Sequence, residues 1–316
     1  MSIALQVALV MVTILVVLLV IGAPIGVAIG MSSAVSMICM IPADVSFATS
    51  AQRIFAGSNS FSLIAIPFFI LAGNIMNNGG IATRLVNCAK VISGRMPGAL
   101  AQSNVVANML FGAISGSGAA AAAAMGGTIG PLEEKEGYDK NYSTAVNVAS
   151  APVGMLIPPS NTMIVYSSVA GSVSIAALFM AGYIPGLLWG GAVMILAGIM
   201  AKKRGYQAEQ RVPVKVALKT FWQAIPSLLL IVIVIGGILG GIFTATEGSA
   251  IAVVYATVLS LIYKAFKIKD IPRIVLEAAK TTGIITFMIG LSSIMSWAMA
   301  FTGIPAAISG VMLSIS

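Results

Sequence analysis

Two polar breaks in strongly apolar sequence hold the residues whose types could bind ions or small molecules. The first is Ser115–Gly118, with the sequence SGSG, and the second is Ile157–Thr162, with the sequence IPPSNT. Glycine permits unusual backbone angles, and proline lacks a donor and disfavours helix at the residue before it. Interrupted backbone at membrane depth persists only where protein buries it or where it lines a cavity. Both breaks therefore predict open helix ends inside the protein.

Open helix ends could bind a cation and a carboxylate. Carbonyl groups of a helix ending near Ile114 suit a hard cation, and N–H groups of a helix starting near Ala119 suit an anion. Neither break contains Asp, Glu, Lys, Arg or His, although a proton-coupled carrier usually has an ionisable residue in the membrane. Carbonyl and hydroxyl ligands instead favour a desolvated alkali cation, and we expect Na⁺.

The two breaks supply two overlapping sets of candidate ligands, and we expect no other cofactor. One Na⁺ is predicted to lie between the breaks, bound largely through the backbone carbonyls of Ser115, Gly116, Ser117, Pro158, Pro159 and Ser160. The substrate carboxylate is predicted to contact Ser117, Asn161 and Thr162, because no intramembrane arginine is available to do so.

Each break also has a purely structural interpretation. Small residues such as those of Ser115–Gly118 allow close helix packing in lipid. Pro158 could simply kink a helix, although a kink needs one proline and no polar trio after it. From the motif alone the first break fits both interpretations equally, and the charge pattern described below favours a helical hairpin.

The composition restricts the class of protein. Hydrophobic residues make up 59% of the chain and charged residues 8%, which predicts an all-α polytopic membrane protein. The net charge of +8 is explained by membrane topology better than by nucleic acid. The chain has no histidine, and neither an activated nucleophile nor paired intramembrane carboxylates are recognisable, so we expect no enzyme. Cys39 and Cys88 are interpreted as packing residues, and Met1–Ile21 as a retained helix.

Apolar stretches long enough to cross a membrane recur along the chain. Amphipathic helices that lie at the membrane surface are predicted near 80–95 and 268–280. Glu247 is interpreted as a cap of the helix that follows it. The crossings are expected near residues 3–21, 24–41, 61–79, 141–171, 174–200, 223–241, 248–263 and 281–301.

The distribution of the basic residues favours one of two membrane topologies for the region 97–132. If this region enters the membrane and returns, all but Arg53 of the 17 basic residues lie on one side. If it crosses once, they are divided between the two sides. The positive-inside rule then makes the basic side the cytoplasm and places the N-terminus outside. Charge therefore predicts a re-entrant hairpin with its tip at Ser115–Gly118.

Five motifs occur in an order that is typical of one family. Together they resemble the large membrane subunit, the M or DctM-like subunit, of tripartite ATP-independent periplasmic (TRAP) transporters. The similarity extends over essentially the whole chain. The motifs are FSLIAIPFF at 61–69, SGSG at 115–118, LIPPS at 156–160, FMAGYIPG at 179–186 and GIFTATE at 241–247.

The resemblance implies an elevator-type, Na⁺-coupled importer in the bacterial inner membrane. Its substrates would be small organic anions such as C4-dicarboxylates, sialic acid, sugar acids or keto acids. Its partners would be a periplasmic substrate-binding protein (P type) and a small four-helix membrane subunit (Q type). A non-transporting membrane scaffold, or an inactive fragment of such a subunit, is the alternative.

The resemblance also implies a division of the chain. The family is built from two inverted repeats. Residues 1–95 would be scaffold-like helices, residues 96–205 a transport-domain half with the hairpin 97–132 and the proline-broken helix 141–171, and residues 206–316 the start of the second repeat. No second hairpin is recognisable before Ser316, so we expect a C-terminally truncated subunit. Asn74 and Ala245 stand where the family often has Glu and Pro.

Overall fold

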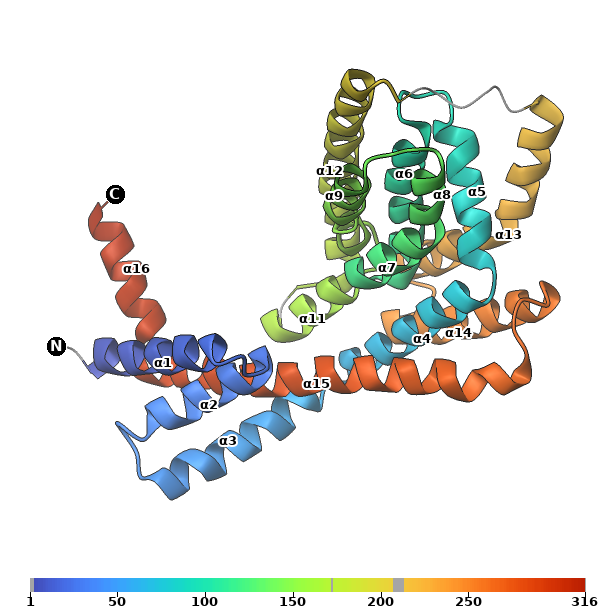
Figure 1. Cartoon of the computed structure of the whole chain (residues 1–316). Coiled ribbons are helices and arrows are strands. Elements are labelled where there is room, and N and C mark those ends of the chain that lie inside the picture. Colours follow the sequence, from blue (N-terminus) through green and yellow to red (C-terminus); the bar gives the residue numbers. More distant parts are fainter. Residues whose placement is uncertain (1–2, 172, 207–212, 316) are drawn as a thin grey trace. The chain divides into compact units, whose positions relative to one another are not determined.

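All regular structure of the chain is helical in the residues that the structure describes. The computed structural model describes residues 3–171, 173–206 and 213–315, and Figure 1 shows its helices. The predicted all-α fold is therefore confirmed.

The chain divides into two compact units. The smaller contains the residues up to Leu63 and from Lys280 on, and the larger contains Ile64–Ala279. The division into 1–95, 96–205 and 206–316 concerns the inverted repeats of the family and stays a prediction. The two breaks lie in the larger unit, so the candidate site can be described within it.

Most predicted crossings correspond to helices of suitable length. Five helices in the described residues are long and apolar enough to cross a membrane, and a sixth crossing would be Lys140–Leu156 with Asn161–Ala170, bent by 47°. Two further apolar helices near the N-terminus are shorter. The five are Phe61–Asn78, which joins η1 (Phe61–Ile64) and α4 (Ala65–Asn78), then α12 (Ile175–Arg204), α13 (Val214–Leu239), α14 (Ala245–Ile262) and α15 (Ile271–Thr302).

The core of the larger unit forms around the helix that leads into the first break. This helix, α6 (Ala99–Ser115), packs against α5, α7, α9, α10 and α12. Its small and polar residues let neighbouring backbones approach closely. The other elements that surround the site are α5 (Ile81–Ser93), α7 (Gly118–Thr128), α8 (Gly130–Lys135), α9 (Lys140–Ser150), α10 (Val153–Leu156) and α11 (Asn161–Ala170).

The amphipathic helix α5 has its apolar face covered by protein. Ile81, Leu85, Cys88 and Ala89 recur at helical spacing and are all buried. The helix packs against α6 and α13. The sequence predicts a helix at the membrane surface at 80–95. In the structure a helix is present there, and its apolar face packs against neighbouring helices.

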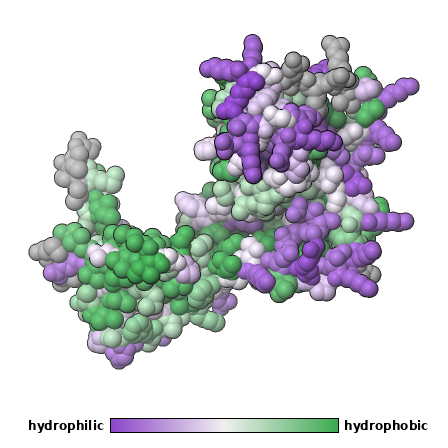
Figure 2. Space-filling model, in the orientation of Figure 1, coloured by the Kyte–Doolittle hydropathy of each residue, from purple (hydrophilic) through white to green (hydrophobic). Residues whose placement is uncertain are grey.

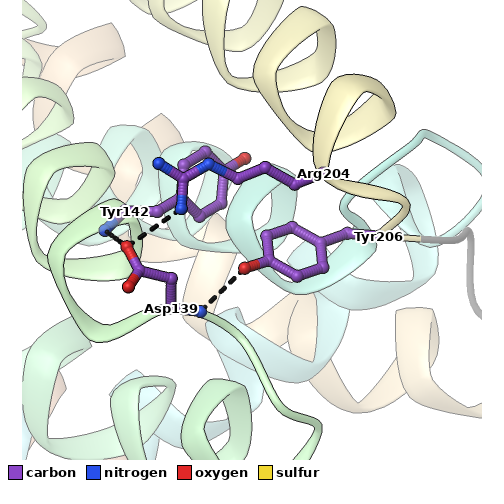
Figure 3. A network of polar contacts seen from close by, with 4 residues as sticks. All are labelled: Asp139, Tyr142, Arg204 and Tyr206. Atoms are coloured by element: carbon purple, nitrogen blue, oxygen red, sulfur yellow. Dashed lines mark hydrogen bonds and ion pairs between the residues drawn. The ribbon is translucent and has the colours of Figure 1, made fainter.

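A polar and aromatic cluster ties the start of α9 to the end of α12 (Figure 3). The Asp139 carboxylate accepts hydrogen bonds from the Tyr142 backbone N–H at 2.9 Å and from the Arg204 guanidinium at 3.0 Å. The Asp139 backbone N–H donates to the Tyr206 hydroxyl at 2.8 Å. The Tyr142 N–H and the Arg204 guanidinium hold the pKa of Asp139 below its ordinary value. Figure 2 shows hydrophilic side chains over this end of the larger unit.

The smaller unit packs helices from both ends of the sequence. Its helices are α1 (Ile3–Val20), α2 (Ile25–Met37), α3 (Ala43–Ser58), α16 (Ile304–Ile315) and the part of α15 from Lys280 on. Ala34, Leu291 and Ile294 form a buried cluster in it. The Ser46 hydroxyl donates to the Ala34 carbonyl at 2.7 Å, which joins α2 to α3.

Two sequence interpretations are changed by the structure. The sequence predicts a surface helix at 268–280 and a separate crossing at 281–301, whereas α15 runs without interruption from Ile271 to Thr302 after a short 3₁₀ turn, η2 (Ile268–Asp270). Pro272 occupies the first turn, where proline is tolerated, and no later proline ends the helix. Glu247 caps α14 as predicted, but its partner in the capping box is Thr244.

Candidate ion and substrate site

The first break is a tight turn between two helices. α6 ends at Ser115, and Gly116 follows it with φ of 60°, a left-handed conformation that favours glycine. Ser117 then caps α7 by accepting a hydrogen bond from the Ala120 N–H at 3.3 Å. Beyond the turn, α7 and α8 both pack against α6, so the chain returns along the helix by which it arrived.

The second break separates α10 from α11 and is held open by the prolines. Pro158 and Pro159 are joined by a cis peptide bond. Ser160 caps α11: its hydroxyl accepts from the Met163 N–H at 3.4 Å and donates to the Met155 carbonyl at 2.5 Å. Both predicted interruptions are therefore present, and each is closed by a serine cap.

The structure brings the two breaks together. The Asn161 backbone N–H donates to the Gly116 carbonyl at 3.4 Å, and the Asn161 side-chain amide donates to the Ser115 carbonyl at 3.4 Å. A Cβ atom on Gly116 would lie 3.0 Å from both the Asn161 nitrogen and the Pro159 carbonyl oxygen. The end of α6 and the start of α11 thus meet through their backbones.

The predicted site residues differ in how deeply they are buried. Ser115, Gly116, Pro158, Pro159, Ser160 and Asn161 are buried, Ser117 is half-buried and Thr162 is exposed. The Asn161 Oδ1 atom is buried without a hydrogen-bond donor. Buried acceptors usually have a partner, so this oxygen is available to a further donor or cation. A site of carbonyl and amide oxygens fits an alkali cation.

Close backbone packing holds the two breaks in place. A Cβ atom on Gly112 would lie 2.2 Å from the Gly154 Cα, so α6 and α10 touch backbone to backbone. A third element, α4, reaches the turn through Gly73, where an added Cβ would lie 3.1 Å from the Ser115 Cβ. Small residues at these positions are therefore required by the fold around the site.

Sequence reasoning did not identify a buried polar network behind the site. The Asn108 side-chain amide lies 2.9 Å from the Asn104 Oδ1, 3.0 Å from the Asn147 Oδ1 and 2.8 Å from the Ser150 hydroxyl. Asn104 and Asn108 are four residues apart on α6, which places them on one helix face. That spacing was the available signal, since polar residues inside membrane bundles face other helices or a cavity.

Comparison with known proteins identifies the family. Residues 12–316 match the family described as the DctM component of the tripartite ATP-independent periplasmic transporter. The chain is 36% identical over 280 residues to the C4-dicarboxylate TRAP transporter large permease protein DctM of Rhodobacter capsulatus, covering 84% of this chain and 64% of that protein. This chain belongs to the DctM family. The family and the apolar helices make it a multi-pass protein of the bacterial inner membrane.

Two further relatives are similar to most of this chain but are longer than it. The chain is 49% identical over 285 residues to the uncharacterised protein YgiK of Salmonella typhimurium, covering 90% of this chain and 66% of YgiK. It is 36% identical over 272 residues to the sialic acid TRAP transporter large permease protein SiaM of Vibrio cholerae, covering 84% of this chain and 62% of SiaM. The chain thus spans less than two thirds of the length of these relatives.

Proposed function

We propose that this chain is a membrane permease subunit of a Na⁺-coupled secondary importer of small organic anions. The observation that carries the proposal is the meeting of two interrupted helices at Ser115, Gly116 and Asn161. Interrupted helices that meet inside the membrane are the usual binding sites of secondary transporters. Relatives are named as permeases for C4-dicarboxylate, sialic acid and 2,3-diketo-L-gulonate, which all carry a carboxylate.

The proposed Na⁺ lies between the turn after α6 and the start of α11. The Ser115 and Gly116 carbonyls both accept hydrogen bonds from Asn161, whose Oδ1 atom has no donor. The Pro159 carbonyl oxygen lies 3.0 Å from the Cβ position of Gly116. The Ser160 hydroxyl already donates to the Met155 carbonyl, so it would bind the ion only through a remaining lone pair. The structure therefore supports adding Asn161 to the cation ligands predicted from sequence.

The proposed substrate carboxylate lies at the helix N-termini that the breaks create. α7 and α11 each begin with a serine cap and present N–H groups of the first turn. Ser117 is half-buried and Thr162 is exposed, so a substrate could reach both side chains. Asn161 is buried. Neutral ligands suit a site that must be empty in part of the transport cycle, because a charged acid without an ion would be costly.

The remaining parts of the proposal concern topology and partners. We place the N-terminus outside and the basic residues in the cytoplasm, with the α6–α7 hairpin entering from the cytoplasm. The transport domain would move as an elevator. The subunit would work with a periplasmic substrate-binding protein and a small four-helix membrane subunit, in line with the name of the family.

Uptake by the complete permease, reconstituted in vesicles with its two partners, tests this function. An inward Na⁺ gradient should drive accumulation of at least one carboxylate substrate, and replacing Na⁺ with choline should reduce uptake to the background of empty vesicles. Uptake that persists without Na⁺ and follows an inward pH gradient would refute Na⁺ coupling. A non-transporting scaffold predicts no uptake under any gradient with any of the candidate acids.

A further inference from the structure

Glu133 is a buried carboxyl group outside the two breaks. It is 1% exposed, whereas the neighbouring residues Glu134, Lys135 and Glu136 are exposed. The helix α8 starts at Gly130 and has Pro131 in its first turn, where proline favours helix initiation. Glu133 follows buried Ile129 by four residues and therefore shares its inward face.

Three buried polar atoms, one of them in this carboxyl group, gather here without a hydrogen bond of ordinary geometry. They are Glu133 Oε1, Asn104 Nδ2 and Ser143 Oγ, contributed by α8, α6 and α9. Glu133, Asn104 and Ser143 are 1%, 0% and 8% exposed. The ion pair between Arg204 and Asp139 does not include Glu133. The Ser143 and Asn104 side chains nevertheless lie close enough to act on the Glu133 carboxyl as hydrogen-bond partners. The three side chains therefore form one buried polar cluster around the carboxyl group.

The same three side chains line a cavity. It has a volume of about 340 Å³, and Thr144 and Asn147 also line it. This space is large enough for an ion with several water molecules. The cavity lies on the side of the protein that the charge pattern predicts to be cytoplasmic.

The charged and titratable groups around Glu133 do not neutralise it by direct contact. Glu134, Tyr138 and Lys140 line the cavity with it, and Tyr142 of α9 acts on it from nearby. α6 and α7 contribute asparagine and glycine to the lining, not charge. Burial raises the pKa of Glu133 to about 7, against the opposing effect of the Ser143 and Asn104 side chains. A buried carboxylate without a cationic partner binds a proton or another cation.

We propose that the cavity beside Glu133 binds a small monovalent cation, a proton or an alkali-metal ion. The Glu133 carboxylate and the Ser143 hydroxyl supply the oxygen ligands, and the Asn104 amide donates to the carboxylate or to water that accompanies the ion. The proposal rests on the burial of Glu133, on the cavity that it lines and on the lack of an ion pair to it in the described residues. It does not depend on the proposed transport function.

Thermal unfolding of the complete protein in detergent tests the site. In choline chloride the unfolding temperature should fall as the pH rises from about 4.5 to about 7, because the native state holds the Glu133 proton more tightly than the unfolded chain. Above that range the Glu133 contribution should be constant. If an alkali cation binds the ionised site, NaCl or KCl at pH 8.5 should raise the unfolding temperature above that in equal choline chloride.

The variant Glu133→Gln distinguishes the contribution of Glu133 to the pH and salt responses from that of the other carboxyl groups. The amide mimics the protonated carboxyl, so the variant should lose this part of the pH dependence and the part of the alkali effect that is due to Glu133. A Na⁺ effect that comes from the site between the two breaks should remain in both proteins. At pH 8.5 it should unfold at a temperature no lower than the wild type. Glu136→Gln, an exposed control on the same segment, should retain both responses of the wild type.

The outcomes distinguish the two cations. A Glu133-dependent response to pH alone identifies the proton, and a Glu133-dependent response to Na⁺ or K⁺ identifies the metal. Equal pH and salt responses in the wild type and Glu133→Gln would overturn the proposal. If Glu133→Gln does not fold, Ser143→Ala replaces it: loss of a polar neighbour should move the pH transition upward, and an unchanged transition would overturn the proposal as well.

Discussion

Replacement of Gly116 by leucine should reduce substrate uptake by about 100-fold or more, while the protein still inserts into the membrane. Gly116 has φ of 60°, and a Cβ atom there would lie 3.0 Å from both the Asn161 nitrogen and the Pro159 carbonyl oxygen. These neighbours are backbone atoms that cannot rotate away. The turn would move from the second break, and displacements of about 1 Å at such a site can cost about 100-fold in rate.

Gly137 provides a matched control for this result. It also has a positive φ, 78°, but nothing lies within 4 Å of its Cβ position. Gly137→Leu therefore imposes a similar backbone strain without a clash at the site. Uptake should stay within a few-fold of the wild type in this control. Equal losses in both variants would mean that backbone strain alone, and not the contact between the breaks, explains the effect.

Gly112→Ala should destabilise the protein by about 1–3 kcal/mol, the usual effect of overpacking in a tight core. The added Cβ would lie 2.2 Å from the Gly154 Cα, so two helix backbones would have to separate. A fall in the unfolding temperature, followed through tryptophan fluorescence in detergent, measures this loss.

A second glycine inside a helix controls for helix propensity. Nothing lies within 4 Å of a Cβ atom on Gly191 in α12. Gly191→Ala should leave stability unchanged or raise it by up to about 1 kcal/mol, since alanine is the better helix former. If Gly112→Ala behaves like Gly191→Ala, α6 and α10 do not pack as closely as the structure describes.

Much of the candidate site could be predicted because its signals are local. Glycine, proline and serine at 115–118 and 157–160 act on the backbone where they stand, so the two interruptions follow from the sequence. Charge and span length indicated that the chain returns after the first break. The sequence predicted contact between α6 and α11 only because one ion was expected to bind both breaks. The structure shows the hydrogen bonds that join them.

The rest depends on contacts between helices. Glu133 lies in a charged run, EEKE, that resembles a solvated loop, and only its position on the inward face of α8 buries it. The network of Asn104, Asn108 and Asn147 forms because α6 and α9 pack with these side chains at the same level. No local sequence pattern specifies that alignment. The continuity of α15 was missed because the basic residues near 268–280 suggested a membrane surface, although nothing there ends a helix.

The Na⁺ concentration that gives half-maximal uptake tests the central proposal most directly. It should be compared in the wild type, in Asn161→Leu and in Thr162→Val, with the complete permease and its partners in vesicles. Asn161→Leu keeps a similar side-chain shape but removes both the unpartnered Oδ1 atom and the amide donor to the Ser115 carbonyl. Thr162→Val removes an exposed hydroxyl one residue away. Loss of one cation ligand should raise the required Na⁺ concentration about tenfold, which corresponds to about 1.4 kcal/mol. Thr162→Val should leave it unchanged, even if the substrate concentration required for uptake rises. An unchanged Na⁺ requirement in Asn161→Leu, or wild-type uptake that does not depend on Na⁺, would contradict a cation site between the two breaks.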